Sequence, residues 1–384
     1  EAAEHWDVYA SMFGGIPTAE IDEMSEFWTA FPALKKALFT ESGIPYVNVS
    51  TPDIKSAIKS HPDVVGFENA FNAAFSTFPA FLKEELIDRM GSIEISKAET
   101  VLSADIFERL KEIPLIDKYA AFQLLDDDWT GISIDLEMLQ TEGFAATKKV
   151  DPNLVIKKKD GKDQEVQEGW VGHIIPFDLV QATLLSTETD ELHCLESRLA
   201  EIPSEYESIL DEMTEEDKES CNDVLTEEGD AFVPKEVSKK IKELKKDRSP
   251  ESVALRILLE KVESLVKSEK EIKAEIKAKS AALQAKTKDT IESLSDEQAL
   301  DLLEKKWIAP LIESIHKLPD TVIDSLVSKI QALQNKYATT FFEVEQQISE
   351  TEATLSEMID DLEGNEYDML GLNELKKLLG GSAE

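Results

Sequence analysis

Residues 249–283 read SPESVALRILLEKVESLVKSEKEIKAEIKAKSAAL, and this run defines the architecture of the chain. Ser249 and Pro250 are typical of a helix start, because serine caps free N–H groups and proline fits the first turn. Glu269 and Lys279 interrupt an otherwise apolar seam with heptad-like spacing. The seam consists of Leu255, Leu258, Val262, Leu265, Ile272, Ile276 and Leu283. Such a helix needs neighbouring helices or another chain to cover it.

Two other runs share this rhythm. The upstream run begins at Phe177 and continues to Met213, and we expect Pro203 to kink or break it. The downstream run begins near Pro319 and ends near Leu362 as one long helix. Its apolar positions include Val322, Leu326, Ile330, Leu333, Tyr337, Val344, Ile348 and Leu355. Three amphipathic segments of this kind predict antiparallel coiled-coil packing.

The first 142 residues predict a compact helical unit. Apolar residues between Ile21 and Leu38 recur at helical spacing, and Pro32 is expected to divide that run into two shorter helices. An aromatic stripe follows at Phe67, Phe71, Phe75, Phe78 and Phe81. We interpret this stripe as core, with a partner groove as the alternative.

The middle of the chain changes character between residues 143 and 176. Asp160-Gly161 separates two extended runs, which is a hairpin signal and predicts an antiparallel sheet of two to four strands. The expected fold is therefore mainly α, with long antiparallel coiled-coil-like helices after the hairpin. We divide the chain into 1–142, 143–176, 177–365 and a partly disordered tail, 366–384.

The formal net charge of −38 indicates a surface that repels phosphate and anionic membranes. The stretch from Lys235 to Lys288 is the exception, with sixteen basic and nine acidic residues, or +7. It is either one solvated helix face or a surface for DNA phosphate or an acidic partner. The candidate contacts are Lys239, Lys240, Lys242, Lys245 and Lys246. Two cysteines and the absence of a long apolar run favour a cytoplasmic protein without membrane contact.

The residues that carry chemistry do not assemble into a recognisable motif. His193 and Cys194 are neighbours on a predicted helix and point about 100° apart, so they form no nucleophile–base pair. Asp126, Asp127 and Asp128 fan around a helix and are interpreted as a solvated helix end. Gly-rich phosphate loops and G-x-S-x-G are absent. We therefore predict no catalytic, cofactor or metal residues in this chain.

Four segments resemble type I restriction–modification DNA methyltransferase subunits, in the region after the catalytic domain. WDVYASMFGGIPTAEIDEMSEFWTAFPALKKALF (6–39) is similar to the segment that follows that domain, and IPLIDKYAAFQLLDDDW (113–129) resembles a second family stretch. GWVGHIIPFDL (169–179) resembles the family's GW-x-x-x-L-(I/V)-P pattern. Lys305-Lys306-Trp307-Ile308 with Ile315-His316 is similar to a fourth pattern.

The resemblance implies a parent enzyme that transfers a methyl group from S-adenosylmethionine to adenine N6 in DNA. It also implies a DNA-specificity subunit and a restriction subunit as partners, with DNA reached through the complex. In the family, C-terminal helices of this type pack against helical spacers of the specificity subunit. The family's catalytic part uses a Gly-rich motif and Asn-Pro-Pro-Phe, and this sequence contains no Pro-Pro pair.

The sequence therefore predicts an assembly region that holds partner subunits through its apolar seams and binds no cofactor itself. Because the chain begins at Glu1, we expect it to be a piece of a longer protein. The main alternative is a coiled-coil scaffold or adaptor unrelated to DNA. The mixed region at 143–176 fits that alternative poorly, and the missing motifs exclude a stand-alone enzyme.

Overall fold

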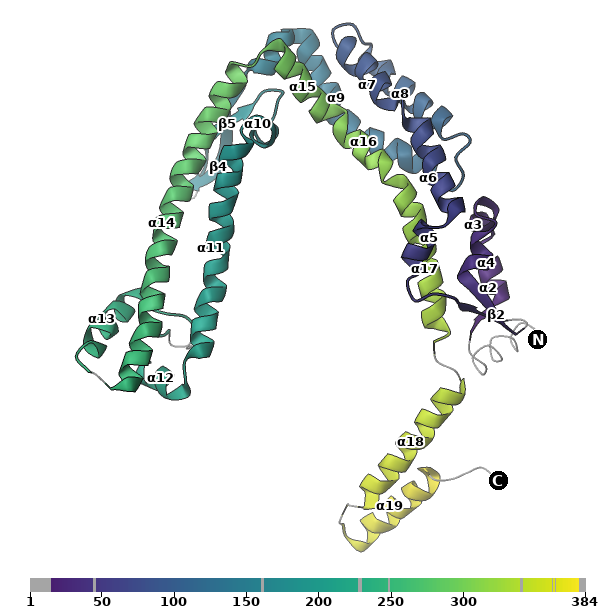
Figure 1. Ribbon diagram of the computed structural model, residues 1–384, viewed down its shortest axis with the longest axis vertical. Coiled ribbons are helices and arrows are strands. Elements are labelled where there is room, and N and C mark those ends of the chain that lie inside the picture. Colours follow the sequence, from purple (N-terminus) through teal and green to yellow (C-terminus); the bar gives the residue numbers. More distant parts are fainter. Residues whose placement is uncertain are drawn as a thin grey trace. The chain divides into compact units, whose positions relative to one another are not determined.

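The computed structural model describes residues 15–43, 46–159, 162–226, 230–247, 249–338, 341–360, 362 and 364–379. These residues are mainly helical, with one three-stranded and one two-stranded antiparallel sheet (Figure 1). This confirms the expected fold class. The chain forms two compact units of non-consecutive segments, a grouping that the sequence patterns did not indicate. Unit 1 comprises Glu1–Glu84, Glu94–Thr130 and Pro310–Glu384, and unit 2 comprises Glu85–Ile93 and Gly131–Ala309.

Unit 1 contains a small sheet that the sequence did not reveal. Its strand order is β1-β3-β2, and Ile16 pairs with Val47. The strands are β1 (Ile16–Pro17), β2 (Phe39–Gly43) and β3 (Tyr46–Val49). They are too short to display a two-residue period. The short helices between β1 and β2 are α2 (Thr18–Asp22), α3 (Ser25–Ala30) and α4 (Leu34–Leu38). Pro32 lies between α3 and α4, as predicted.

The aromatic stripe of unit 1 is core. Four of its five phenylalanines are buried, and Phe71 stacks on Phe75 with ring centroids 4.7 Å apart. Arg109 holds this region by donating to the carbonyl of Ala74 at 2.7 Å and the hydroxyl of Thr77 at 2.9 Å. The elements here are α5 (Ile54–Lys59), α6 (Pro62–Phe75), α7 (Phe78–Leu82), the π-helix η1 (Lys83–Asp88), α8 (Ile95–Arg109) and α9 (Lys118–Glu142). The parts of η1 from Glu85 and of α9 from Gly131 belong to unit 2.

The last predicted helix is two helices, so the expectation of one long helix was wrong. The two helices are α17 (Leu318–Lys336) and α18 (Phe341–Asp360). They are preceded by α16 (Ala309–His316) and followed by α19 (Glu366–Leu379). The sequence at the division contains two threonines and two phenylalanines, which are weaker helix formers than Ala or Leu. α17 packs on α5, and Lys59 pairs with Asp320 at 2.6 Å.

Unit 2 contains a long antiparallel helix pair, which we call the arm. It consists of α11 (Ser186–Glu212) and α14 (Pro250–Glu292), and α10 (Phe177–Thr183) precedes it. Ion pairs fix the antiparallel register, from Lys279 with Glu191 near the base to Lys261 with Glu212 near the tip. The sequence predicted a kink or a break at Pro203, and α11 continues through this proline without a break. The side chain of Pro203 is exposed, and packing against α14 keeps the helix intact on both sides of it.

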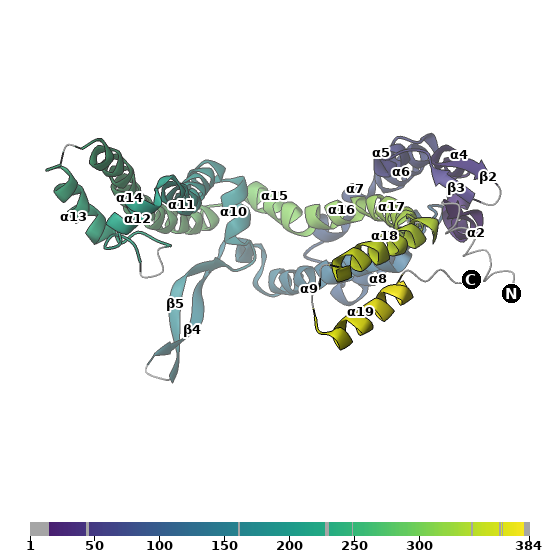
Figure 2. The same ribbon diagram turned by 90° about the horizontal axis from the view of Figure 1, so that it is seen from below.

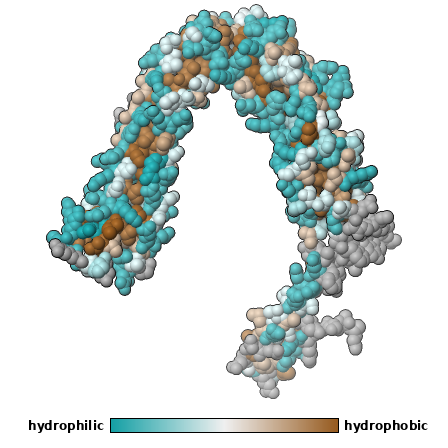
Figure 3. All heavy atoms as spheres, in the orientation of Figure 1, coloured by the Kyte–Doolittle hydropathy of each residue, from teal (hydrophilic) through white to brown (hydrophobic). Residues whose placement is uncertain are grey.

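The tip of the arm carries its own hydrophobic core, within a stretch whose acidic sequence did not indicate one. α12 (Glu215–Ser220) and α13 (Pro234–Leu244) fold there against the ends of α11 and α14. The buried members are Ile209, Met213, Cys221, Val224, Val237, Ile241, Leu255, Leu259 and Val262. In Figure 3 apolar residues gather on the tip. The tip is therefore a small packed unit, held together by side chains from α11, α13 and α14 and from the segment that follows α12.

The predicted hairpin is present as β4 (Val150–Lys159) and β5 (Lys162–Gly172), and Asp160-Gly161 lies outside the described residues. It follows the 3₁₀-helix η2 (Phe144–Lys148) and projects away from the helices of unit 2 (Figure 2). The helix start predicted at Ser249 is also present. Ser249 accepts the N–H of Ser252 at the start of α14, and Ser295 and Gln298 form a capping box before α15 (Asp296–Trp307).

Candidate interaction surface

The apolar seam of α14 is covered mainly by the chain itself. Leu255, Val262 and Leu283 are buried, and the other four predicted seam positions, Leu258, Leu265, Ile272 and Ile276, are half-buried. The buried residues near the tip belong to its core. This part of the predicted partner-binding set therefore holds the arm together and presents little apolar area to a partner.

The α17 part of the second set is also covered within unit 1. Val322, Leu326 and Ile330 are buried, whereas Leu333 and Tyr337 are half-buried. The hydroxyl of Tyr337 donates to the Glu20 carboxylate at 2.7 Å, and Lys336 pairs with the same oxygen at 2.6 Å. These contacts lower the pKa of Glu20 through the hydrogen bond from Lys336 and then that from Tyr337.

The predicted residues that the chain leaves open lie on α18. Val344, Ile348 and Leu355 are exposed and fall on one stripe of the helix. Further exposed apolar residues continue this stripe and extend onto α19, so that we define an α18–α19 surface. Its members are Val344, Ile348, Leu355, Met358, Leu362, Tyr367, Leu370 and Leu375, each between 41% and 84% exposed.

The α18–α19 surface is flanked mainly by carboxylates. Between Tyr337 and Leu375 the sequence contains eleven Asp and Glu residues and no Lys or Arg, and Lys376 and Lys377 follow near the end of α19. α18 and α19 pack on each other, and Ile359 is buried while its neighbour Met358 is 62% exposed. An apolar stripe with acidic flanks is suited to a basic amphipathic partner and disfavours phosphate.

The five predicted basic contacts lie on α13 or just after it, at the tip. Acidic side chains of the chain partly neutralise them, because Lys239 pairs with Glu236 at 2.7 Å and Lys240 with Asp223 at 3.3 Å. Lys245 is 3.8 Å from Glu260, and Lys242 and Lys246 are exposed.

Residues from the sequence segments 169–179 and 305–308 stabilise the packing of unit 2 at the base of the arm. The buried carboxylate of Asp135 accepts the indole N–H of Trp307 at 2.7 Å and also pairs with Lys306. The Lys306 ammonium donates to the carbonyl of Ile174 at 2.6 Å. Gly172 is required beside this point, because a Cβ there would lie 1.7 Å from the carbonyl oxygen of Ile175. The Lys-Trp and Gly-Trp patterns therefore have a structural use in this unit.

His173 joins the foot of the hairpin to the end of α9. Its Nδ1 lies 2.6 Å from the Asp151 carboxylate and its Nε2 3.2 Å from Glu142. The hydrogen bond with Asp151 and then that with Glu142 raise the pKa of His173 against the effect of burial. The arrangement favours an imidazolium that bridges two carboxylates, and it contains no nucleophile.

The other polar positions considered from the sequence lie apart. His193 and Cys194 are both exposed on α11. The three aspartates 126–128 lie within α9 and not at a helix end, and burial followed by the charge of Asp127 raises the pKa of Asp128. Within the described residues, no group of three or more His, Cys, Asp or Glu side chains could hold a metal ion.

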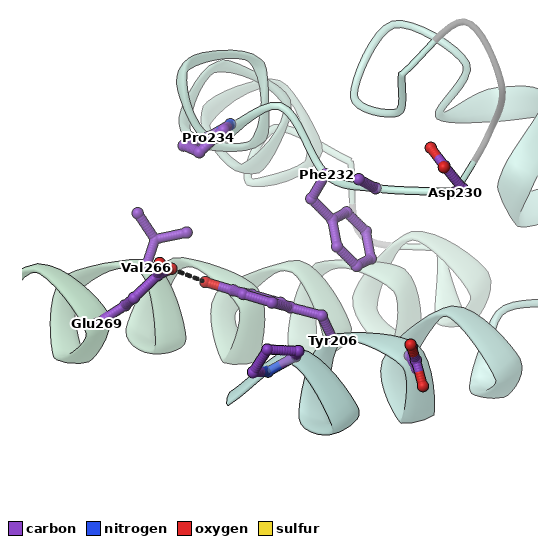
Figure 4. Close-up of a pocket in the computed structure, with 9 residues that line it drawn as sticks. Tyr206, Asp230, Phe232, Pro234, Val266 and Glu269 are labelled. Carbon is purple, nitrogen blue, oxygen red and sulfur yellow. Dashed lines mark hydrogen bonds between the residues drawn. The ribbon is translucent and has the colours of Figure 1, made fainter. Parts of the chain in front are cut away.

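The tip of the arm contains a pocket that no sequence pattern indicated (Figure 4). It is formed where α11, α14 and the segment before α13 meet. The aromatic pair Tyr206 and Phe232, 26 positions apart in the sequence, could not be associated by periodicity. Only the tertiary fold places these two rings side by side.

None of the described helices is both long enough and apolar enough to cross a membrane. Comparisons of the chain with protein-family models, with curated proteins and with solved structures found no match.

Proposed function

We propose that this chain is the assembly region of the adenine-N6 DNA methyltransferase subunit of a type I restriction–modification complex. It holds the DNA-specificity subunit through the α18–α19 surface and carries no catalytic group itself. The observation that carries this proposal is the apolar stripe of that surface, which the chain leaves uncovered. The resemblance of four sequence segments to that family supplies the identity of the partner.

A helix partner suits this stripe because its residues follow helical spacing. Val344, Ile348 and Leu355 lie within about 40° of one another around α18. Covering such side chains stabilises a complex by roughly 25 cal/mol per Å² of apolar area. A standard interface buries about 800 Å² on each partner, and two packed helices of this length can supply a patch of that order.

The charge of the surface specifies the partner further. Eleven carboxylates against two lysines, Lys376 and Lys377, favour partner helices that carry Lys and Arg beside their apolar stripe. The same charge opposes direct contact with DNA phosphate, so DNA and the restriction subunit join through the rest of the complex. S-adenosylmethionine binds the catalytic part of the parent protein, whose motifs lie outside this chain.

Co-purification with a tagged specificity subunit tests the proposal. The double variant Ile348→Asp with Leu355→Asp places carboxylates in the stripe, and we expect at least about tenfold weaker retention. Ala353→Asp is the matched control, because Ala353 is exposed and lies about 180° from Val344 on the same helix. Equal retention of the double variant and the control would refute docking through this surface.

The antiparallel arm favours a second candidate function, a coiled-coil scaffold unrelated to DNA. The two functions differ in what the purified chain does alone. The assembly region is expected to bind a specificity subunit with a defined stoichiometry. A scaffold would form a stable homo-oligomer, which light scattering would detect, and would not bind specificity subunits.

A further inference from the structure

The pocket at the tip combines aromatic walls with carboxylates. It has a volume of about 270 Å³ and is lined by Tyr206, Phe232, Val266 and two prolines, together with Glu207, Asp230 and Glu269. No Lys or Arg is among its lining residues. Figure 4 shows the Tyr206 and Phe232 side chains lying between the helices that form the pocket.

The aromatic walls are fixed in place. The rings of Tyr206 and Phe232 have centroids 6.2 Å apart, and the phenol of Tyr206 donates to the Glu269 carboxylate at 3.1 Å. Burial, followed by the hydrogen bond to Glu269, raises the pKa of Tyr206 to about 12. The phenol therefore stays neutral at physiological pH, and its ring keeps an electron-rich face for a cation.

The carboxylates of the pocket are satisfied to different degrees. The Glu269 carboxylate forms an ion pair with Lys273 and accepts the hydrogen bond from Tyr206. Asp230 accepts the hydroxyl of Thr226 through Oδ1 at 2.6 Å. Among the described residues, Glu207 forms neither a hydrogen bond nor an ion pair. Glu207 and Asp230, both lining residues, thus retain free acceptor capacity.

We propose that this tip pocket binds a Lys or Arg side chain from a basic segment of a partner protein. The aliphatic stem of that side chain lies against the aromatic rings and prolines, and its cationic head pairs with Glu207 and Asp230. The apolar and acidic parts of the lining match the apolar stem and the charged head of such a side chain. The proposal does not depend on the α18–α19 surface or on the parent enzyme.

The surroundings of the pocket favour the same occupant. Residues 199–234 contain thirteen Asp and Glu and one Lys, a net charge of −12. Such a field steers a basic protein segment toward the tip and repels nucleic acid. The basic helix α13 does not cancel this attraction within the pocket, because it contributes only Pro234 to the lining.

Methyl NMR on the whole chain tests the proposal with a defined probe. The probe is Nα-acetyl-arginine N-methylamide, and the citrulline counterpart has nearly the same shape without the charge. We expect saturable shifts at the Val266 methyl groups with the arginine probe and about tenfold weaker binding of the citrulline compound. Equal binding of the two compounds, or no saturable shift with arginine, would overturn the proposal.

A pair of charge-matched variants separates the pocket from the acidic surface around it. Glu207→Gln with Asp230→Asn is expected to raise the Kd of the arginine probe about fivefold. Glu216→Gln with Glu219→Gln removes the same charge from exposed positions of α12 outside the pocket. If both double variants weakened binding equally, the probe would be reporting the general field of the tip and the pocket assignment would fail.

Discussion

The indole nitrogen of Trp307 donates a hydrogen bond to Oδ2 of Asp135 at 2.7 Å, across 172 positions of the chain. Lys306 pairs with the same oxygen and reaches the carbonyl of Ile174. One buried carboxylate therefore joins α9, α15 and the segment after the hairpin. Ile174, Lys306 and Trp307 lie in segments that the sequence had marked only as a resemblance, whereas Asp135 lies in none of them.

Loss of this carboxylate should destabilise unit 2. Asp135→Ala leaves the Trp307 N–H and the Lys306 ammonium without their shared acceptor, so we expect the free energy of unfolding to fall by about 2–4 kcal/mol. Urea denaturation measures this change. Asp301→Ala removes the exposed partner of Lys305 on the same helix and should cost less than about 1 kcal/mol. Similar losses in the two variants would argue against a stabilising role of Asp135 as the shared acceptor of Trp307 and Lys306.

Rising pH should loosen the foot of the hairpin. The folded pKa of His173 is raised above the unfolded value of about 6.5, so its stabilisation is complete below that pH and is lost as pH rises through the folded pKa. The stability difference between wild type and His173→Gln should thus shrink as the pH rises above the unfolded value of about 6.5 and through the raised folded pKa. Amide exchange of β4 and the NMR titration of His173 measure both effects. His193→Gln, at an exposed position of α11, should show no such trend.

A methyl group at Gly172 should displace the segment that follows β5. The added Cβ would lie 1.7 Å from the Ile175 carbonyl oxygen, which is backbone and cannot move aside alone. We expect Gly172→Ala to lower the free energy of unfolding by about 2–3 kcal/mol. Gly131→Ala on α9 meets no atom within 4 Å and should stabilise by up to about 1 kcal/mol. Thermal unfolding of the two variants gives the comparison.

Replacing Pro203 should stabilise the arm. Alanine restores the N–H that the interior of α11 lacks, and we expect a gain of about 1–3 kcal/mol in the free energy of unfolding. Pro250→Ala is the control, since a first-turn proline removes no intrahelical hydrogen bond and its loss should bring no gain. A gain of equal size at both positions would contradict the explanation.

Adjacent residues of α18 should separate folding from docking. Ile359 is 6% exposed and Met358 62% exposed. Ile359→Asp should open the α18–α19 pair, measured as faster amide exchange in both helices, because an unpaired carboxylate is costly to bury. Met358→Asp should leave exchange unchanged and weaken retention of the specificity subunit. Faster exchange in Met358→Asp would show that this residue is part of the internal packing.

Local signals in the sequence were sufficient for the helices and the hairpin. Ser249 caps a helix as predicted, because capping is a matter of neighbouring residues. Periodicity also identified which face of each helix is apolar. It could not say what covers that face, and so Leu326 and Ile348 were placed in one partner-binding set although Leu326 is buried within unit 1 and Ile348 is exposed.

Features that depend on tertiary contacts were beyond the sequence. Cys221 and Val237 meet at the tip because α12 and α13 fold back, and the acidic composition of that stretch hid its few apolar residues. Pro203 violates a local rule, and packing with α14 overrides it. The tip pocket has the same origin, since its two aromatic rings come from different parts of the chain.

The uninterrupted helix α14 fixes the length of the arm. Its 43 residues extend for about 65 Å at 1.5 Å per residue, and α11 follows in matched register. Adding one residue to either helix would rotate every later seam position by about 100° and misalign the two partners. Related chains can therefore lengthen the span between base and tip only by inserting heptads in both helices together, in increments of about 10 Å.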